Sequence, residues 1–222
     1  HGGGYVLNSV DTHDPTVSYF SEKLRTKIFS LEYSLSPENK FPDAMNEALD
    51  SINWLIKNGN KISNISLCGD SAGAHLAASV THHLANEDLE NVHSQFLIYP
   101  MCDPNCNSES IELFQEGYLL TKNAMEWFWD KFKNSDNDKN LDTFNLMLLD
   151  SNKKIPKTLI VTAGFDPLSD EGEKYAFLLH QNGTYVKQLH YPSLFHGFAN
   201  MTRLKSARKA VNDFLTAYKE IL

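Results

Sequence analysis

Short apolar runs alternate along the chain with longer stretches in which apolar residues return every three or four positions. The short runs are typical of buried strands, and the longer pattern is typical of helices that place one face on a core. Ala44, Ala48 and Ile52 mark one such face, and Asn58-Gly59 follows it as a typical helix stop. The pattern predicts strands over residues 28–33, 65–68, 94–99, 158–162 and 184–189, and helices over residues 16–25, 44–56, 72–84, 122–132, 170–181 and 204–221.

This alternation predicts fold class α/β, with a mostly parallel sheet covered by helices on both faces. Residues 101–155 interrupt the alternation. They are polar at both ends and carry aromatic residues between, and Thr121 is a typical N-cap for the helix over 122–132. We expect this insertion to project above the carboxyl ends of the strands as part of a helical lid.

Two short glycine-rich motifs carry the candidate chemistry. Residues 69–73, Gly-Asp-Ser-Ala-Gly, fit G-x-S-x-G, in which the serine stands on a sharp turn between a strand and a helix. The predicted strand 65–68 and helix 72–84 supply that context for Ser71. Residues 1–4, His-Gly-Gly-Gly, fit a loop whose backbone N–H groups form an oxyanion hole. Because acyl transfer needs a nucleophile and an oxyanion site together, the two motifs predict one site.

A general base and an acid are expected after the serine, in the order Ser, Asp, His. Asp166 follows the predicted strand 158–162, and His196 lies on a loop after the strand 184–189. Taken singly, Asp166 is a common turn residue before a proline and His196 is one of nine histidines. Their order and their places after strands favour the catalytic interpretation. Asp170 and Glu171 are alternative acids, whereas Asp70 is expected to be a structural hydrogen-bond acceptor.

At this point the chain resembles the hormone-sensitive-lipase family of α/β-hydrolase esterases. The resemblance runs nearly from end to end, and its motifs stand in the family's order. One position differs, because the family usually has arginine where Ser34 stands. The motifs are HGGG at 1–4, YSLSPE at 33–38, GDSAG at 69–73, DPLSDEG at 166–172 and HGF at 196–198.

The resemblance implies an α/β-hydrolase fold and hydrolysis of carboxylic esters. It implies that Ser71 is the nucleophile, His196 the base and Asp166 the residue that orients the histidine. The oxyanion-hole donors that it implies are the backbone N–H groups of Gly3, Gly4 and Ala72.

Aromatic residues beside these motifs and in the insertion are candidates for a substrate pocket. We expect them to contact the acyl or alcohol group of an ester. The alternative is that they pack the insertion onto the core, and the sequence leaves both open. The candidates are Tyr5, Phe165, Trp127 and Trp129.

The family also has several strands and part of the lid ahead of the HGGG motif. The strand that leads into this motif would lie between those at 28–33 and 65–68. Without it, two sheet edges would carry unpaired backbone groups. We therefore expect residues 1–222 to be an α/β-hydrolase catalytic domain that lacks its N-terminal strands.

Composition narrows the classes of partner. The 222 residues, 41% of them hydrophobic, are enough for one domain with a sizeable core. A net charge of −8 without a basic cluster argues against nucleic acid, and no apolar run reaches the length of a membrane span. Three cysteines favour a reducing cytoplasm. No residue cluster calls for a metal or an organic cofactor, and a homodimer stays open.

Three interpretations of function compete at this stage. The first is a serine carboxylesterase acting on small, short-acyl esters. The second is an amide or carbamate hydrolase with the same triad. The third is a non-catalytic small-molecule-binding protein, against which the presence of His196 argues. Beside these three, the missing N-terminal strands leave open an inactive remnant of the fold.

Overall fold

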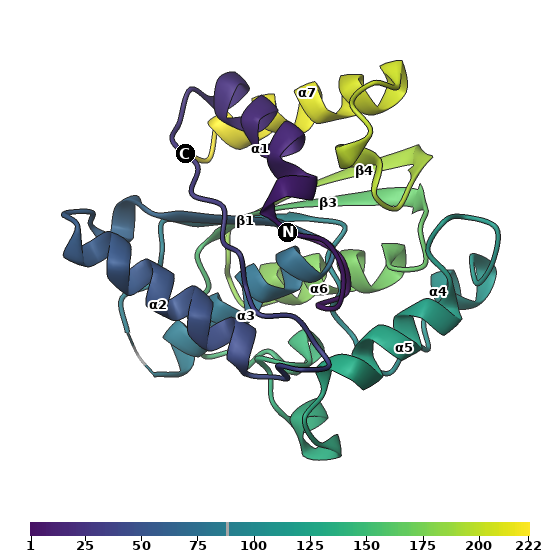
Figure 1. Cartoon of the computed structure of the whole chain (residues 1–222), viewed down its shortest axis with the longest axis horizontal. Helices are drawn as coiled ribbons and strands as arrows, with labels where there is room; N and C mark the ends of the chain where they lie inside the picture. Colours follow the sequence, from purple (N-terminus) through teal and green to yellow (C-terminus); the bar gives the residue numbers. More distant parts are fainter. Residues whose placement is uncertain (88) are drawn as a thin grey trace.

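A computed structural model describes residues 1–87 and 89–222. Among these residues, four parallel strands form one sheet in the order β1-β2-β3-β4 (Figure 1). Each strand pairs with the next one in the sequence, so every connection crosses over the sheet. The strands are β1 (Ser66–Asp70), β2 (Ser94–Ile98), β3 (Lys157–Phe165) and β4 (Val186–Phe195).

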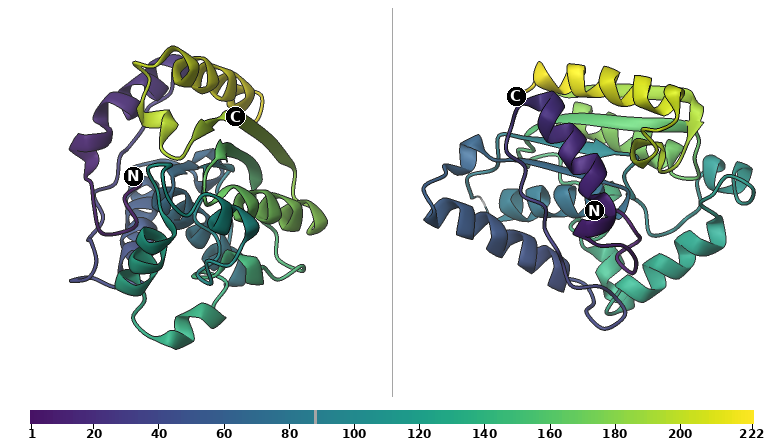
Figure 2. Two further views of the ribbon diagram at one scale, coloured as in Figure 1. Left: turned by 90° about the vertical axis from the view of Figure 1, so that its right-hand side faces the viewer. Right: turned by 45° about the horizontal axis from the view of Figure 1, so that its top comes forward.

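Helices cover both faces of the sheet, as expected for parallel strands with long connections. On one face α1 (Val10–Leu24) and α7 (Lys205–Lys219) lie side by side (Figures 1 and 2). On the other face α3 (Ala72–Asn86) packs on β1 and β2, and α6 (Ser169–Gln181) packs on β3. The helix α2 (Asp43–Lys57) packs against α3.

The insertion, residues 101–155, lies on the side to which the strands point (Figure 1). It contains α4 (Glu109–Leu113), α5 (Lys122–Phe132) and the short turns η2 (Asp136–Asn140) and η3 (Leu146–Leu148). The side chain of Thr121 accepts a hydrogen bond from the Ala124 N–H at 3.1 Å, so the predicted N-cap of α5 is confirmed. Outside the insertion, two further turns are η1 (Ile62–Asn64) and η4 (Phe198–Asn200).

The predicted strand over residues 28–33 is wrong. No described strand lies between this segment and β1, so its backbone has no neighbour with which to form a ladder. Side chains hold it instead: the Tyr33 hydroxyl donates to the carbonyl of His1 at 2.7 Å, and Glu47 accepts from the Ser34 N–H at 2.7 Å. An apolar run therefore becomes a strand only where a neighbouring strand is present to pair with its backbone.

The other predicted strands and helices are present, with shifts at their ends. The two largest shifts are equal. The helix α1 begins at Val10 because Ser9 and Thr12 form a reciprocal capping box ahead of the predicted start, and β4 runs on to Phe195 past its predicted end at residue 189. In the described part of the chain, no helix combines the length and the apolar character needed to cross a membrane.

Candidate active site

Ser71 stands on the turn between β1 and α3. Its backbone has φ 53° and ψ −118°, a conformation that non-glycine residues adopt only under constraint. The Ser71 N–H donates to the carbonyl of Ile98 at 2.9 Å, which ties the turn to the end of β2. The side chain is thereby raised above the sheet at the N-terminus of α3, where the helix dipole favours negative charge.

The three residues predicted to act together lie in one hydrogen-bonded row. His196 Nε2 is 3.0 Å from Ser71 Oγ, and His196 Nδ1 is 2.8 Å from Asp166 Oδ2. Asp166 is fully buried, and its other oxygen accepts from the Leu168 N–H at 2.8 Å. Because the carboxylate can only accept, Nδ1 donates to it and Nε2 presents a lone pair to the serine hydroxyl.

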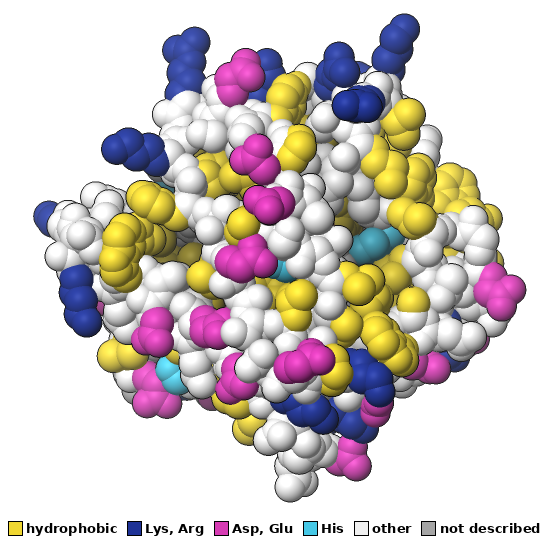
Figure 3. Space-filling view, in the orientation of Figure 1, with side chains coloured by type: hydrophobic (Ala, Val, Ile, Leu, Met, Phe, Trp, Pro, Cys, Tyr) yellow, Lys and Arg dark blue, Asp and Glu magenta, His cyan; other side chains and the backbone are white. Residues whose placement is uncertain are grey.

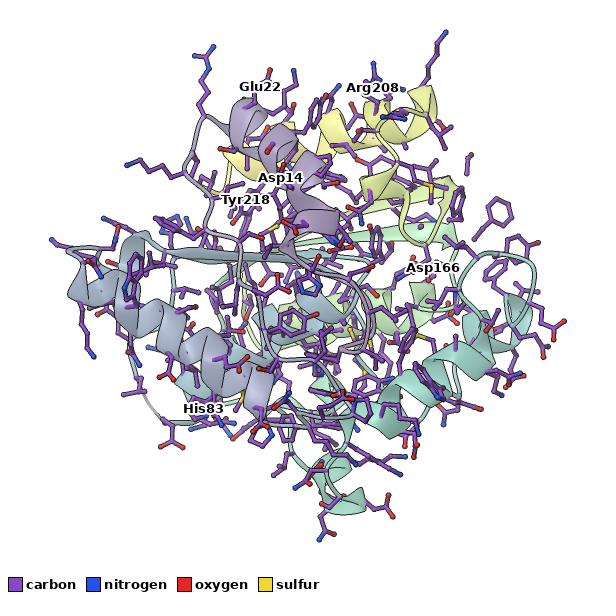
Figure 4. The ribbon with its side chains drawn as sticks, in the orientation of Figure 1. Asp14, Glu22, His83, Asp166, Arg208 and Tyr218 are labelled. Atoms are coloured by element: carbon purple, nitrogen blue, oxygen red, sulfur yellow. The ribbon has the colours of Figure 1, made fainter. Side chains whose placement is uncertain are left out.

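Asp166 and His196 meet because they follow neighbouring strands. The register pairs Phe165 at the end of β3 with Phe195 at the end of β4, so the next residue of each strand emerges at the same edge. Figure 4 shows Asp166 just beyond β3, on the side where α4 and α5 lie. Asp170 points elsewhere, since its carboxylate accepts from the Ser110 N–H at 2.7 Å. Asp166 is thus the acid that contacts the histidine.

The loop over residues 1–5 lies beside this row. Gly3 has φ 123° and Gly4 has φ 61°, and both values disfavour any residue with a side chain. Among the described residues, the N–H groups of Gly3, Gly4 and Ala72 donate to no protein acceptor. Unpaired backbone donors are rare in folded chains, so three of them near one serine are available for a negatively charged oxygen.

Asp70 anchors this loop to the serine turn. Its carboxylate accepts from the Gly2 N–H at 2.8 Å and from Asn200 Nδ2 at 2.9 Å, and it lies 3.3 Å from His13 Nε2. Burial alone would raise the pKa of Asp70, but the hydrogen bond and charge of His13, together with the charged amino terminus and the Asn200 hydrogen bond, outweigh burial and lower the pKa to about 2. The carboxylate therefore joins the glycine loop, α1 and the segment after His196, as the structural role predicted for it requires.

The four aromatic candidates for a pocket are placed differently from one another. Tyr5 is 1% exposed, and its ring stacks on Phe132 with centroids 3.6 Å apart. Trp129 is 3% exposed within the same core. Both rings are enclosed by other core side chains, and the pocket role of Tyr5 and Trp129 stays a prediction. Trp127 is exposed on the outer side of α5, and Phe165, half-exposed next to Asp166, stacks on Tyr118.

Phe128 is an aromatic residue of the insertion that is not among these four candidates. A Cβ built on Gly4 would overlap the Phe128 ring, so this ring lies directly against the glycine loop. Helical spacing could have found it. Met125, Trp129 and Phe132 form the buried face of α5, and residue 128 falls at the edge of that face. Figure 3 shows hydrophobic side chains gathered around a hollow in which histidine atoms reach the surface.

No group of three or more His, Cys, Asp or Glu side chains is placed to hold a metal ion within residues 1–87 and 89–222. The site consists of one hydroxyl, one imidazole, one carboxylate and free backbone donors. This set is suited to transferring a proton and holding a transient oxyanion.

Comparison with known proteins identifies the fold and the family. A family model described as alpha/beta hydrolase fold matches residues 1–200. The chain is 33% identical to the carboxylic ester hydrolase LipN of Mycobacterium tuberculosis, over 99% of this chain and 61% of that protein. It is 31% identical to an ethyl acetate hydrolase of Pseudomonas putida, over 90% of this chain and 65% of that protein. It thus spans about six-tenths of the length of these curated relatives.

Solved structures give the same result. An esterase of Pyrobaculum calidifontis superposes with a TM-score of 0.92 at 32% identity, over all of this chain and 74% of that one. A second structure is the ester hydrolase EH1AB1 from the metagenome of Lake Arreo, complexed with a bipyridine phosphonate derivative. It superposes with a TM-score of 0.92 at 34% identity, over 99% of this chain and 71% of that one. The fold predicted from the motifs is confirmed, and the chain belongs to the α/β-hydrolase fold family, among the esterases that resemble hormone-sensitive lipase.

Proposed function

We propose that this chain carries the active site of a serine carboxylesterase that hydrolyses small, short-acyl esters through an acyl-enzyme intermediate. The observation that carries the proposal is the row Ser71–His196–Asp166, with hydrogen-bond distances of 3.0 and 2.8 Å. The names of the relatives, which include an ethyl acetate hydrolase and an arylesterase, support the choice of substrate class.

In the first half of the reaction, Ser71 Oγ attacks the ester carbonyl while His196 Nε2 takes the hydroxyl proton. The carbonyl oxygen becomes negative and accepts hydrogen bonds from the N–H groups of Gly3, Gly4 and Ala72. One such donor contributes roughly 3–4 kcal/mol of transition-state stabilisation in other hydrolases. His196 then gives the proton to the leaving alcohol, and an ester of Ser71 remains.

In the second half, a water molecule gives its proton to His196 and attacks the acyl-enzyme. The same N–H groups hold the oxyanion, and His196 returns the proton to Ser71 Oγ as the acid leaves. Asp166 holds the imidazole with Nε2 facing the serine and stabilises its positive form in both halves. Because Asp166 is fully buried, water does not weaken that interaction.

The insertion supplies the wall of the substrate site in this proposal. The Phe128 ring lies against Gly4, whose N–H is one of the donors assigned to the ester carbonyl oxygen. Phe165 and Tyr118 form a second, half-exposed apolar surface beside Asp166. We assign the short-acyl preference to Phe128, and we assign the insertion the role of a lid.

The direct test is hydrolysis of p-nitrophenyl acetate, butyrate and octanoate by the chain, with Ser71→Ala as the control. We expect turnover that falls along the series and disappears in Ser71→Ala. Turnover that persists in the variant, or its absence from a folded sample, would contradict the proposal. A p-nitroanilide of the same acyl group separates the amide-hydrolase alternative, which predicts comparable rates for both leaving groups.

Homodimer formation and a cytoplasmic location stay predictions from the sequence.

A further inference from the structure

The helix that follows Ser71 carries a buried polar stripe. His75, Ser79 and His82 are spaced by four and three residues, so they lie on one face of α3, and each is at most 1% exposed. Each side chain bonds to one of three consecutive carbonyls of the insertion. The pairs are His75 Nε2 with Phe144 O at 2.9 Å, Ser79 Oγ with Thr143 O at 2.6 Å, and His82 Nδ1 with Asp142 O at 3.0 Å.

His75, the member of the stripe nearest Ser71, has a second partner. Its Nδ1 lies 2.6 Å from the Tyr5 hydroxyl. Since the Phe144 carbonyl can only accept, Nε2 carries the proton and Nδ1 accepts from the Tyr5 O–H. The neutral imidazole therefore satisfies both neighbours, and burial, which lowers the pKa of His75 to about 4, favours that form.

Tyr5 transmits this contact to the glycine loop. It follows Gly4 directly, and its own backbone has φ 65°, an uncommon value for a bulky residue. Its carbonyl accepts from the Ser36 N–H at 2.8 Å, while its ring stacks on Phe132. The loop is thus held at both ends, by Asp70 at Gly2 and by His75 at Tyr5.

We propose that His75 is a positioning residue for the oxyanion hole, linking the insertion to the glycine loop through Tyr5. This inference rests on the proposed esterase function, because it assigns a role in the oxyanion step of that reaction. His75 touches neither the serine hydroxyl nor the place of the substrate, and acts by fixing where the Gly3 and Gly4 N–H groups stand relative to Ser71. If such donors move by a fraction of an ångström, the transition state loses more stabilisation than the bound substrate does.

Two substitutions of His75 each keep one of its two hydrogen bonds and remove the other. In His75→Asn the amide oxygen takes the place of Nδ1 and keeps an acceptor for Tyr5, but the contact with Phe144 is lost. In His75→Gln the amide reaches the place of Nε2 and keeps a donor for Phe144, but the acceptor for Tyr5 is lost. Tyr5→Phe removes the hydroxyl and keeps the stacked ring. Ser79→Ala is the matched control, since it removes the neighbouring rung without touching Tyr5.

The readouts are kcat and KM for p-nitrophenyl butyrate and inhibition by an alkyl trifluoromethyl ketone, whose adduct with serine places an oxyanion in the hole. We expect Tyr5→Phe and His75→Gln to lower kcat about tenfold with KM unchanged, less than the loss of a whole donor. The inhibition constant for the ketone should rise by the same factor. His75→Asn should lower kcat less than His75→Gln does, and Ser79→Ala should keep kcat near that of the unmodified chain and lose only thermal stability.

Equal losses of kcat in His75→Asn and His75→Gln would overturn the assignment, because the Tyr5 contact would then not be the one that matters. So would a fall in melting temperature for Tyr5→Phe with kcat and ketone inhibition unchanged. Ester turnover that does not depend on Ser71 would instead contradict the proposed function, whatever the variants do. The two failures are therefore separate.

Discussion

The carboxyl edge of the sheet and the insertion over residues 101–155 both face the candidate site, but they position their residues by different means. At the sheet edge, Asp166 and His196 stand directly after paired strands, and the ladder between β3 and β4 brings them together. In the insertion, the backbone over residues 142–144 is held by side chains of α3. One region is placed by backbone pairing and the other by buried polar contacts.

This difference has a consequence for how each region tolerates change. A strand-end residue keeps its place when its neighbours are substituted, because backbone hydrogen bonds do not depend on the side chain. Removing one side chain of the α3 stripe takes one of three hydrogen bonds from the insertion and leaves a backbone carbonyl unpaired. We therefore expect the sheet edge to govern the rate of the chemistry, and the insertion to govern substrate choice and stability.

The largest effect should come from the sheet edge. Replacing Asp166 by Asn keeps the shape of the side chain but lets it donate to Nδ1, which turns the histidine to the wrong tautomer. We expect kcat to fall about 10⁴-fold, as in other Ser-His-Asp enzymes. Steady-state kinetics with p-nitrophenyl butyrate measures it.

Asp170→Asn is the control for that substitution. Its carboxylate contacts the Ser110 N–H and not the histidine, so we expect kcat to change by no more than about twofold. A large loss in Asp170→Asn with full activity in Asp166→Asn would transfer the role of the acid to Asp170.

Three consecutive residues of α5 test the insertion. Trp129→Ala should cost about 3–5 kcal/mol of unfolding free energy, because it empties a buried site, and should leave the ratio of octanoate to acetate turnover unchanged. Phe128→Ala should raise that ratio about tenfold, since the ring no longer blocks a longer chain beside Gly4. Trp127→Ala, on the exposed side, should change neither the unfolding free energy nor the ratio of octanoate to acetate turnover. Chemical denaturation and the p-nitrophenyl ester series measure both quantities.

A changed acyl preference in Trp129→Ala or Trp127→Ala, with none in Phe128→Ala, would reverse our placement of the pocket wall. A loss of all activity in Phe128→Ala would show that the ring supports the glycine loop and does not only limit the acyl chain.

The sequence predicts the sheet edge well because its chemistry coincides with local signals. Ser71 stands between an apolar run and a helix, and Asp166 and His196 each follow an apolar run, so motif and strand pattern agree. Because the strands are parallel, these strand-end residues lie at one edge of the sheet. This shared position follows from the whole pattern of strands and cannot be predicted from one motif. The fold class and the row of three residues could both be reached in this way.

The insertion could not be predicted in the same way. Aromatic residues such as Tyr5, Trp129 and Phe128 look alike in a sequence, and only the direction of each side chain separates core from pocket wall. Likewise His75 is a single polar residue in an alanine-rich helix, and its two partners lie 70 and 69 residues away. Segment 28–33 fails for a related reason, because a strand requires a partner that no local pattern supplies.

The α3 stripe should also make stability depend on pH. Burial, with a smaller contribution from the nearby His82, lowers the pKa of His75 from 6.5 to about 4 against the opposing effect of the hydrogen bond to the Phe144 carbonyl. Between these values the unfolded chain binds a proton that the folded chain does not, so stability falls as pH decreases from 6.5 to 4. Over the whole interval from pH 6.5 to pH 4, the free energy of unfolding falls by about 3 kcal/mol.

Urea unfolding at pH 7 and pH 5, compared between the chain and His75→Asn, isolates this contribution. We expect the advantage of the unmodified chain over the variant to shrink by about 2 kcal/mol at the lower pH. An advantage that stays constant, or grows on acidification, would mean that His75 is charged in the folded protein, contrary to its bonds with Tyr5 and Phe144.

The smallest effect concerns the start of α5. The Thr121 hydroxyl accepts from the Ala124 N–H, one of the first-turn donors that has no partner inside the helix. Thr121→Ala should therefore cost about 1 kcal/mol and lower the melting temperature by about 2–4 °C, whereas Thr121→Ser keeps the hydroxyl and most of the stability. Calorimetry gives the cost, and amide exchange at Ala124 shows whether the loss is local. If Thr121→Ala also raises octanoate turnover, fraying of the first turn of α5 reaches Phe128, and the wall of the pocket depends on the cap. If it does not, the buried face of α5 holds Phe128 in place by itself, and stability and substrate choice are separable within one helix.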